Sequence, residues 1–280
     1  MSKNFPINFP MPETKLIIEA SKKAGKSVME LYDHPISSTL KSDKEPVTEA
    51  DIKSNEIIKK IISVFGYPIL SEESKDNSRR LDSKKILIVD PLDGTSDFIK
   101  KTGEFTIMIS LVEDKKPILG VIYWPTEDTL YLAQKDQGSF KLQNGTWSKI
   151  SVSNVSDLTK CRVVGSRYHI SDNEQNLLNF LNTSQFTSKG SSLKVADISS
   201  GNAELYFTTT NKIKQWDTCA SYCLITEAGG KMTDMLGNDL EYNTEKLNHE
   251  NGILVSNGLI HNHITKIYRE SMNNNEEKKF

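Results

Sequence analysis

The sequence lacks any hydrophobic run long enough to cross a membrane, since a spanning helix needs roughly 20 consecutive apolar residues. Its first residues also lack a charged segment followed by an apolar one, which is the pattern of a secretion signal. Both observations argue against a membrane partner. We therefore expect a cytoplasmic protein.

Cysteine is scarce as well, with three residues at Cys161, Cys219 and Cys223. Three thiols cannot all pair with one another. The spacing of the last two does not match a zinc knuckle, and no pair of histidines lies nearby. We interpret all three as buried thiols in a reducing compartment.

The chain has no excess of one charge, because its formal net charge is −2. Without a basic field, a nucleic-acid polymer is not an expected partner. The composition is 36% hydrophobic and 26% charged over 280 residues, which suits a soluble protein with a large core. No internal repeat is present, so we expect one or two domains.

Residues 86–98, with the sequence ILIVDPLDGTSDF, carry the strongest chemical signal. Ile86–Asp90 has the pattern of a short buried strand that ends in a carboxylate, and Pro91 is expected to stop it. Asp93 follows Asp90 at a spacing of three. One tight turn could therefore direct both carboxylates at one point.

The residues that follow are typical of a phosphate cradle. Gly94 allows the backbone to come close to a ligand, and Thr95 and Ser96 can start a helix whose free N–H groups attract phosphate. Magnesium favours oxygen ligands and commonly bridges carboxylates to a phosphate. The stretch thus predicts a magnesium–phosphate site. The alternative is an ordinary strand, turn and helix with solvated acids.

The segment before this motif predicts two helices and a strand. Apolar residues from Pro12 to Leu31 follow a helical stripe, and Thr48 with Asp51 resembles a capping box that opens a second helix. Gly25-Lys26-Ser27 mimics the end of a phosphate-binding loop. The preceding glycine and strand of that motif are missing, so we reject this interpretation.

Two acids follow the short strand predicted at Tyr67–Ser71. Glu72 and Glu73 are either solvated loop residues or metal ligands. The next residues, 74–85, are charged and poor in apolar groups, which indicates a mobile surface loop.

Periodicity then predicts a strand-rich region followed by alternating strands and helices. An antiparallel sheet is expected from the strands Phe105–Val112, Ile118–Tyr123, Thr129–Gln134, Phe140–Leu142 and Trp147–Val152. An α/β second half is expected from strands at 162–165, 203–207, 231–233 and 253–255 and helices at 172–181, 191–201, 216–227 and 259–268. Residues 271–280 are expected to be a solvated tail.

Two motifs together resemble one known family. DPLDGTSDF and WDTCASYCLITEAGG, which begins at Trp216, are similar to the two signatures of the lithium-sensitive, magnesium-dependent phosphatases that include inositol monophosphatase. The resemblance covers roughly residues 12–268. It implies an α/β fold, a layered αβαβα sandwich of the inositol monophosphatase and fructose-1,6-bisphosphatase type. Within it we expect two subdomains, residues 1–155 with most metal ligands and residues 156–280 with substrate-binding elements.

The resemblance also implies a ligand set and a mechanism. Two or three Mg²⁺ ions would be held by Glu72, Asp90, the carbonyl of Leu92, Asp93, Asp217 and, through water, Glu73. Thr95 would orient the attacking water with Asp51 as its partner, and Glu72 would join them in catalysis. This chemistry needs no histidine or cysteine nucleophile, and Cys219 and Cys223 within the second motif are interpreted as buried thiols.

Within the family, the finer resemblance is to 3'(2'),5'-bisphosphate nucleotidases of the CysQ type. It rests on Gly190-Ser191-Ser192-Leu193-Lys194 and on Gly165-Ser166-Arg167-Tyr168-His169, in which Tyr168 departs from the usual small residue. The implied substrate contacts are Asp93, Gly94, Thr95, Arg167, His169, Ser192, Lys194 and Asp217. For Arg167 and His169 the alternative is an exposed strand end without a ligand.

The resulting hypothesis is a small-molecule enzyme. It would remove the 3'-phosphate of 3'-phosphoadenosine 5'-phosphate, or of its sulfated form, and release AMP and phosphate. The alternatives are an inositol monophosphatase or fructose bisphosphatase of the same fold, or a catalytically silent metal or nucleotide sensor. The expected assembly is a monomer or a homodimer.

Overall fold

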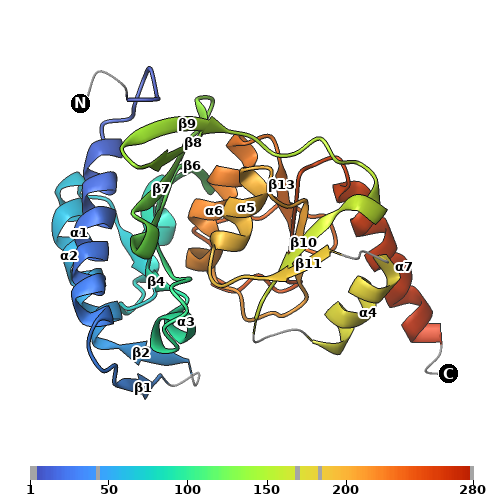
Figure 1. Cartoon of the computed structure of the whole chain (residues 1–280). Helices are drawn as coiled ribbons and strands as arrows, with labels where there is room; N and C mark the ends of the chain where they lie inside the picture. Colours follow the sequence, from blue (N-terminus) through green and yellow to red (C-terminus); the bar gives the residue numbers. More distant parts are fainter. Residues whose placement is uncertain (1–4, 42–44, 168–170, 182–184, 278–280) are drawn as a thin grey trace.

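The structure, a computed structural model, describes residues 5–41, 45–167, 171–181 and 185–277. Two sheets and three layers of helix form an αβαβα sandwich, which confirms the expected fold class (Figure 1). From one outer face to the other, the helical layers are α1 (Thr14–Tyr32) with α2 (Glu49–Ile62), α5 (Leu193–Ser199) with α6 (Gln215–Glu227), and α4 (Asp172–Leu181) with α7 (His261–Glu277).

The larger sheet has seven strands in chain order, β3 to β9. β3 is parallel to β4, and the other neighbours are antiparallel. The strands are β3 (Ile69–Ser71), β4 (Lys85–Asp93), β5 (Thr106–Glu113), β6 (Lys116–Trp124), β7 (Thr129–Gln134), β8 (Gly138–Gln143) and β9 (Thr146–Ile150).

The smaller sheet is mixed, with the strand order β11-β10-β12-β14-β13. Its strands are β10 (Arg162–Gly165), β11 (Gln185–Ser188), β12 (Leu205–Thr208), β13 (Lys231–Thr233) and β14 (Ile253–Ser256). The expected boundary at residues 155 and 156 falls between the last strand of one sheet and the first of the other. The division into two subdomains stays a prediction.

Strand β4 is apolar on both sides because helices cover both faces of its sheet. Leu87 and Val89 pack into the core under α1 and α2, whereas Ile86 and Ile88 pack into the core toward α6 and the smaller sheet. A strand buried on both faces has a continuous apolar run instead of an alternating one. The carboxylate of Asp90, which follows this apolar run, therefore lies inside the molecule.

The expectation that Pro91 ends this strand is wrong. Asp90 pairs with Met108 and Asp93 with Thr106, so β4 continues through a bulge that holds one extra residue. A bulge tolerates proline because the extra residue makes no ladder hydrogen bond. In a regular strand, residues three apart point to opposite faces, and the extra residue brings both carboxylates to the same face.

The expected solvated tail is also different in the structure, because α7 continues to Glu277. The apolar stripe of this helix ends near Tyr268, so the sequence pattern predicted a helix that stopped there. A helix already begun adds further residues at little cost. Residues 278–280 of the expected tail lie outside the described residues. Two further elements were missed, strand β11 and the hairpin of β1 (Ser38–Leu40) and β2 (Pro46–Thr48).

Residues 74–85 lie mostly at the surface, as expected, but they are not irregular throughout, and their mobility stays a prediction. They contain a 3-10 helix, Ser78–Asp82, whose Arg80 is only 2% exposed. The Arg80 guanidinium bonds to both carboxylate oxygens of Asp76, at 2.7 and 3.0 Å, and to Asn243 Oδ1 at 2.9 Å. Charged residues can be packed in this way when each donor has a partner, which composition alone does not reveal.

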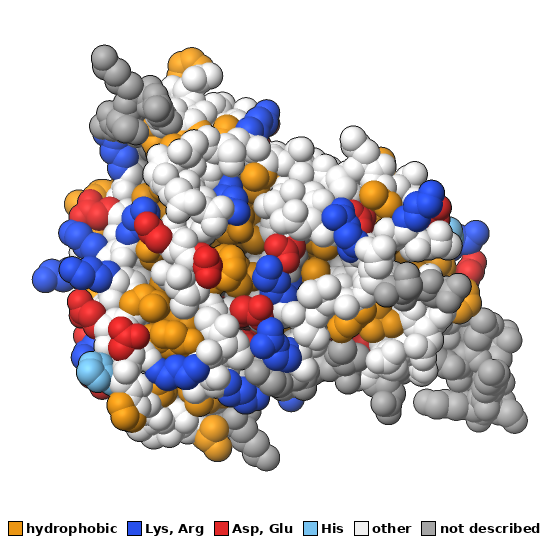
Figure 2. Space-filling view, viewed as in Figure 1, with side chains coloured by type: hydrophobic (Ala, Val, Ile, Leu, Met, Phe, Trp, Pro, Cys, Tyr) orange, Lys and Arg blue, Asp and Glu red, His pale blue; other side chains and the backbone are white. Residues whose placement is uncertain are grey.

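All three cysteines are buried thiols, as expected. Among the residues that the structure describes, no helix is both long and apolar enough to cross a membrane. Acidic and basic side chains are interspersed on the face shown in Figure 2.

Arg80→Ala should lower the free energy of unfolding by about 2–4 kcal/mol, because it leaves the buried Asn243 Oδ1 without its donor and removes the ion pair with Asp76. The matched control is Arg79→Ala, since Arg79 is the exposed neighbour in the same short helix. Urea unfolding measures both variants. Equal losses in the two variants would show that Arg80 does not anchor the segment.

Candidate active site

The acidic residues of the three sequence motifs meet where β3 and β4 end, inside the sandwich. The Glu72 N–H donates to the Val89 carbonyl at 3.2 Å, so the parallel register sets Glu72 beside Asp90. The charges of Glu72, Asp93 and Asp217 act on the carboxylate of Asp90. The fold thus gathers carboxylates from β3, β4 and α6, as the resemblance implied.

Burial dominates the electrostatics of this cluster. It raises the pKa of Asp90 well above its ordinary value, and the neighbouring carboxylates raise that pKa further. The pKa of Asp217 is raised for the same two reasons. For Glu72, burial raises the pKa to about 7 although Lys41 acts in the opposite direction. Buried like charges of this kind are relieved either by bound protons or by nearby cations.

Two of the aspartates are fixed by helix starts. Asp51 and Asp217 each occupy the third position of a helix, α2 and α6, and accept the backbone N–H of the residue that precedes the helix. These bonds join Thr48 N to Asp51 Oδ2 and Lys214 N to Asp217 Oδ2, both at 2.7 Å. In each case one carboxylate oxygen is bound by the backbone and the other remains for the site. The capping box predicted at Thr48 is confirmed.

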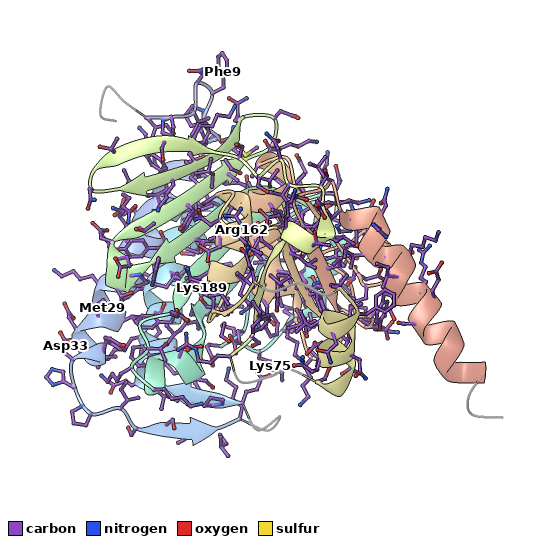
Figure 3. The ribbon with its side chains drawn as sticks, turned by 45° about the vertical axis from the view of Figure 1, so that its right-hand side comes forward. Phe9, Met29, Asp33, Lys75, Arg162 and Lys189 are labelled. Atoms are coloured by element: carbon purple, nitrogen blue, oxygen red, sulfur yellow. The ribbon has the colours of Figure 1, made fainter. Side chains whose placement is uncertain are left out.

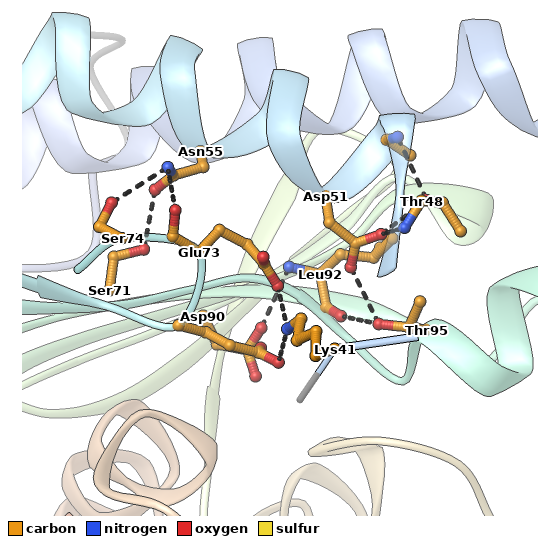
Figure 4. Close-up of polar contacts among 12 residues, drawn as sticks. Lys41, Thr48, Asp51, Asn55, Ser71, Glu73, Ser74, Asp90, Leu92 and Thr95 are labelled. Atoms are coloured by element: carbon orange, nitrogen blue, oxygen red, sulfur yellow. Dashed lines mark hydrogen bonds and ion pairs between the residues drawn. The ribbon is translucent and has the colours of Figure 1, made fainter. Parts of the chain in front are cut away.

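The expected pair of Thr95 and Asp51 is also confirmed. The Thr95 hydroxyl donates to Asp51 Oδ1 at 2.9 Å, and it lies 3.2 Å from the carbonyl of Leu92 (Figure 4). Asp51 is buried, and burial raises its pKa while its hydrogen bonds from Thr48 and Thr95 lower it. Because Thr95 donates its single proton inside the protein, its oxygen can act toward a ligand only as an acceptor.

A lysine that sequence reasoning passed over lies in the cluster. The Lys41 ammonium, next to the β1–β2 hairpin, bonds to Glu72 Oε1 at 2.6 Å and to Glu73 Oε1 (Figure 4). Burial alone would lower its pKa, but the two glutamates raise it overall. The residues around Lys41 are polar and follow no period, so the sequence did not predict this contact.

The metal ligands stay a prediction. Among the described residues, no three aspartate, glutamate, histidine or cysteine side chains are arranged so that they could hold an ion by themselves. The donor set nevertheless fits hard divalent cations, because it consists of the buried Asp90, half-buried carboxylates and the Leu92 carbonyl. The ammonium of Lys41 also shows that a cation is accommodated between Glu72 and Glu73.

The turn at residues 190–194 contacts this cluster directly. The Ser192 N–H donates to Asp93 Oδ2 at 2.5 Å, and the Ser192 and Thr106 hydroxyls are 2.7 Å apart. Gly94 has a left-handed φ of 92°, and an added Cβ would lie 3.2 Å from the Ser191 side chain. Glycine is therefore needed here for the close approach of the turn as well as for its φ.

Lys194 is buried at the base of this turn. Its ammonium donates to the Ser191 carbonyl at 2.7 Å. Burial lowers its pKa, and Asp93, Asp97, Glu104 and Asp217 act against that lowering. Its contact with substrate stays a prediction, whereas its observed bonds support the turn.

Arg167 lies near the same turn and is held by a second residue that sequence reasoning missed. Its Nη2 donates to Glu104 Oε2 at 2.6 Å, and the Gly190 N–H donates to the same oxygen at 2.7 Å. A single acid in the stretch Gly103-Glu104-Phe105 carries no pattern that would single it out. His169 and Tyr168 lie outside the described residues.

This combination defines a class of protein. A layered α/β sandwich, with carboxylates gathered at strand ends and a threonine fixed by an aspartate, is the arrangement of a phosphoric monoester hydrolase. The chain belongs to the inositol monophosphatase family, whose model matches residues 11–273. Members of this family are metal-dependent phosphatases.

Individual relatives agree with this assignment. The 3'(2'),5'-bisphosphate nucleotidase CysQ of Buchnera aphidicola is 38% identical over 233 residues, which cover 81% of this chain and 86% of the relative. The solved structure of CysQ from Bacteroides thetaiotaomicron is 30% identical, with a TM-score of 0.75 and coverage of 87% and 96%. An inositol monophosphatase from Thermotoga maritima is 26% identical, with a TM-score of 0.81 and coverage of 94% and 99%.

The raised pKa values predict a pH-dependent stability for the metal-free protein. Because the pKa of Glu72 rises from 4.5 to about 7, the folded protein binds its proton more tightly than the unfolded chain does. The resulting stabilisation is present below pH 4.5 and is lost as the pH rises through 7. Asp90 and Asp217 are shifted in the same direction. The melting temperature should therefore decrease as the pH is raised from about 5 to about 8.

Magnesium should reverse this loss, because cations and protons compete for the same oxygens. At a fixed concentration of about 100 times its Kd at pH 8, Mg²⁺ adds about 2.7 kcal/mol at that pH, a rise in Tm on the order of 5 °C. The rise should be larger at about pH 8 than at about pH 5, and smaller in Asp90→Asn. Calorimetry at constant ionic strength, with potassium as the control, measures it. An equal rise at both pH values would contradict the predicted ligand set.

Proposed function

We propose that this chain hydrolyses the 3'-phosphate of 3'-phosphoadenosine 5'-phosphate to give AMP and phosphate, with its sulfated form as a second substrate. The proposal includes a cytoplasmic enzyme that acts on the free nucleotide as a monomer or homodimer. It is supported by relatives that are named bisphosphate nucleotidases and by the contacts that join Arg167 to the acidic cluster.

The observation that carries this proposal is one connected set of contacts. Arg167 and the Gly190 N–H share Glu104, and two residues further along the Ser192 N–H bonds to Asp93. The Arg167 guanidinium, which we propose to bind a second phosphate, is thereby held at a fixed place relative to Asp93, a candidate metal ligand. Arginine suits this task because its planar guanidinium binds phosphate through two parallel hydrogen bonds.

The residues proposed to hold two or three magnesium ions are Glu72, Asp90, the Leu92 carbonyl, Asp93 and Asp217, with Glu73 acting through water. When bound, the ions would offset the charge of the phosphate and activate water on one side of it. Burial supports this role, since an ionised carboxylate in this cluster gains more from a cation than a solvated one would.

Thr95 and Asp51 are proposed to position the attacking water. Asp51 accepts the Thr95 proton, so the threonine oxygen is left to accept a hydrogen bond from water. Asp51 is itself fixed by the start of α2, so the threonine oxygen is fixed in turn. Such preorganisation acts mainly in the transition state.

Thr95→Ala should lower kcat by about 100-fold or more while KM changes little, because it removes the acceptor for the attacking water. Thr95→Ser keeps the hydroxyl and should retain most of the activity. Steady-state phosphate release measures both variants, and circular dichroism checks their fold. If the loss in Thr95→Ala appears only in KM, Thr95 binds the substrate phosphate and does not orient water.

Substrate choice is tested with a panel of phosphate esters in the presence of magnesium. The panel contains 3'-phosphoadenosine 5'-phosphate, its sulfated form, inositol phosphate, fructose bisphosphate and AMP. We expect the highest kcat/KM with the bisphosphate nucleotide, because its second phosphate can engage Arg167. Arg167→Ala should raise KM for the nucleotide about tenfold. Arg79→Ala, which removes an exposed arginine elsewhere, is the control.

The same panel decides between the alternatives. Equal kcat/KM for inositol phosphate and the nucleotide would overturn the substrate assignment and leave the family chemistry. A preference for inositol phosphate or fructose bisphosphate would favour one of the related enzymes. Tight binding of the nucleotide without any phosphate release would indicate a sensor.

A further inference from the structure

Glu104 lies in the short connection between α3 (Thr95–Ile99) and β5, and this connection is rigidly held. The Gly103 carbonyl accepts hydrogen bonds from Trp124 Nε1 at 2.7 Å and from the Thr126 hydroxyl at 2.8 Å. The Glu104 N–H donates to the Thr102 hydroxyl at 3.2 Å, and that hydroxyl donates to Asp97 at 2.7 Å. The end of β6, the turn that follows it and α3 therefore fix the backbone from which Glu104 projects.

The Glu104 carboxylate connects two stretches of the other half of the chain. One oxygen, Oε2, accepts both the Arg167 guanidinium and the Gly190 N–H. The contact is close, because a Cβ added to Gly190 would lie 2.6 Å from the Glu104 carbonyl and 2.6 Å from Asp97 Oδ2. Lys189, labelled in Figure 3, precedes Gly190 in the chain and bonds to Asp197 at 2.8 Å.

This contact leaves most of the guanidinium available. Arg167 has five N–H donors, and among the described residues only its Nη2 has a protein partner. Its side chain is 33% exposed and that of Glu104 is 21% exposed. A pair with this exposure adds little to stability, so its structural consequence is the orientation of Arg167.

We propose that Glu104 is a positioning residue that sets the preference for a substrate with a second phosphate. It acts through Arg167, whose remaining N–H groups it directs toward the space beside the 190–194 turn. This inference rests on the proposed function and deepens it. Glu104 carries a negative charge close to an expected phosphate, so its benefit lies in fixing the guanidinium and outweighs its repulsion of the anion.

The experiment compares kcat/KM for 3'-phosphoadenosine 5'-phosphate with kcat/KM for inositol phosphate in Glu104→Ala and Glu104→Gln. Glu104→Ala should raise KM for the nucleotide about tenfold and lower the selectivity ratio to a similar extent, because Arg167 loses its fixed orientation. Glu104→Gln keeps an acceptor oxygen in the same place and should lose only about threefold. Glu127→Ala, which removes an exposed glutamate of the same half, is the control.

A double-mutant cycle with Arg167→Ala separates positioning from a general structural role. If Glu104 acts through Arg167, Glu104→Ala should change KM by less than about twofold once Arg167 is absent. An unchanged melting temperature would agree with this role. A full tenfold loss in the Arg167→Ala background, or equal losses with both substrates, would overturn the proposal. A lower KM in Glu104→Ala would also overturn it, since repulsion would then dominate.

These outcomes are distinct from a failure of the proposed function. If the unmodified protein shows no preference for the nucleotide, the proposed substrate is wrong, and no selectivity exists for Glu104 to set. If the preference is present and Arg167→Ala reduces it, the function stands, and the Glu104 variants alone decide the positioning role.

Discussion

The repulsion between carboxylates that the fold buries together is the constraint on which the rest of the site depends. Asp90 is surrounded by Glu72, Asp93 and Asp217, and burial weakens the screening that water would give them. The two apolar cores on either face of β4 supply the packing that holds them there. The protein's own ammonium groups, Lys41 and Lys194, compensate part of this charge.

The same backbone device orients acidic groups on both sides of the centre. Asp51 at the start of α2 and Asp217 at the start of α6 each give one oxygen to a backbone N–H and present the other. Carboxylates are also favoured at helix N-termini by the helix dipole. Capping is usually discussed as a source of stability, and here it also fixes the direction of a functional group.

Much of this arrangement could be predicted from the sequence because it is encoded locally. The apolar run before Asp90, the capping box at Thr48 and the helix that opens near Trp216 all follow from short-range patterns, and the structure confirms them. Lys41 and Glu104 could not be found in this way. Their partners lie 31 or more residues away, and no periodicity links residues at such separations.

The bulge in β4 limits the evolutionary changes that this part of the chain tolerates. Asp90 and Asp93 share a face only because β4 holds one more residue between them than β5 holds between their partners. If the same residues were paired as a regular strand, their spacing of three would turn one carboxylate toward α1 and α2. The irregular pairing is therefore more constrained than the identity of the intervening side chains. Changes that replace the bulge by regular pairing, more than changes that keep it, should separate active from inactive descendants.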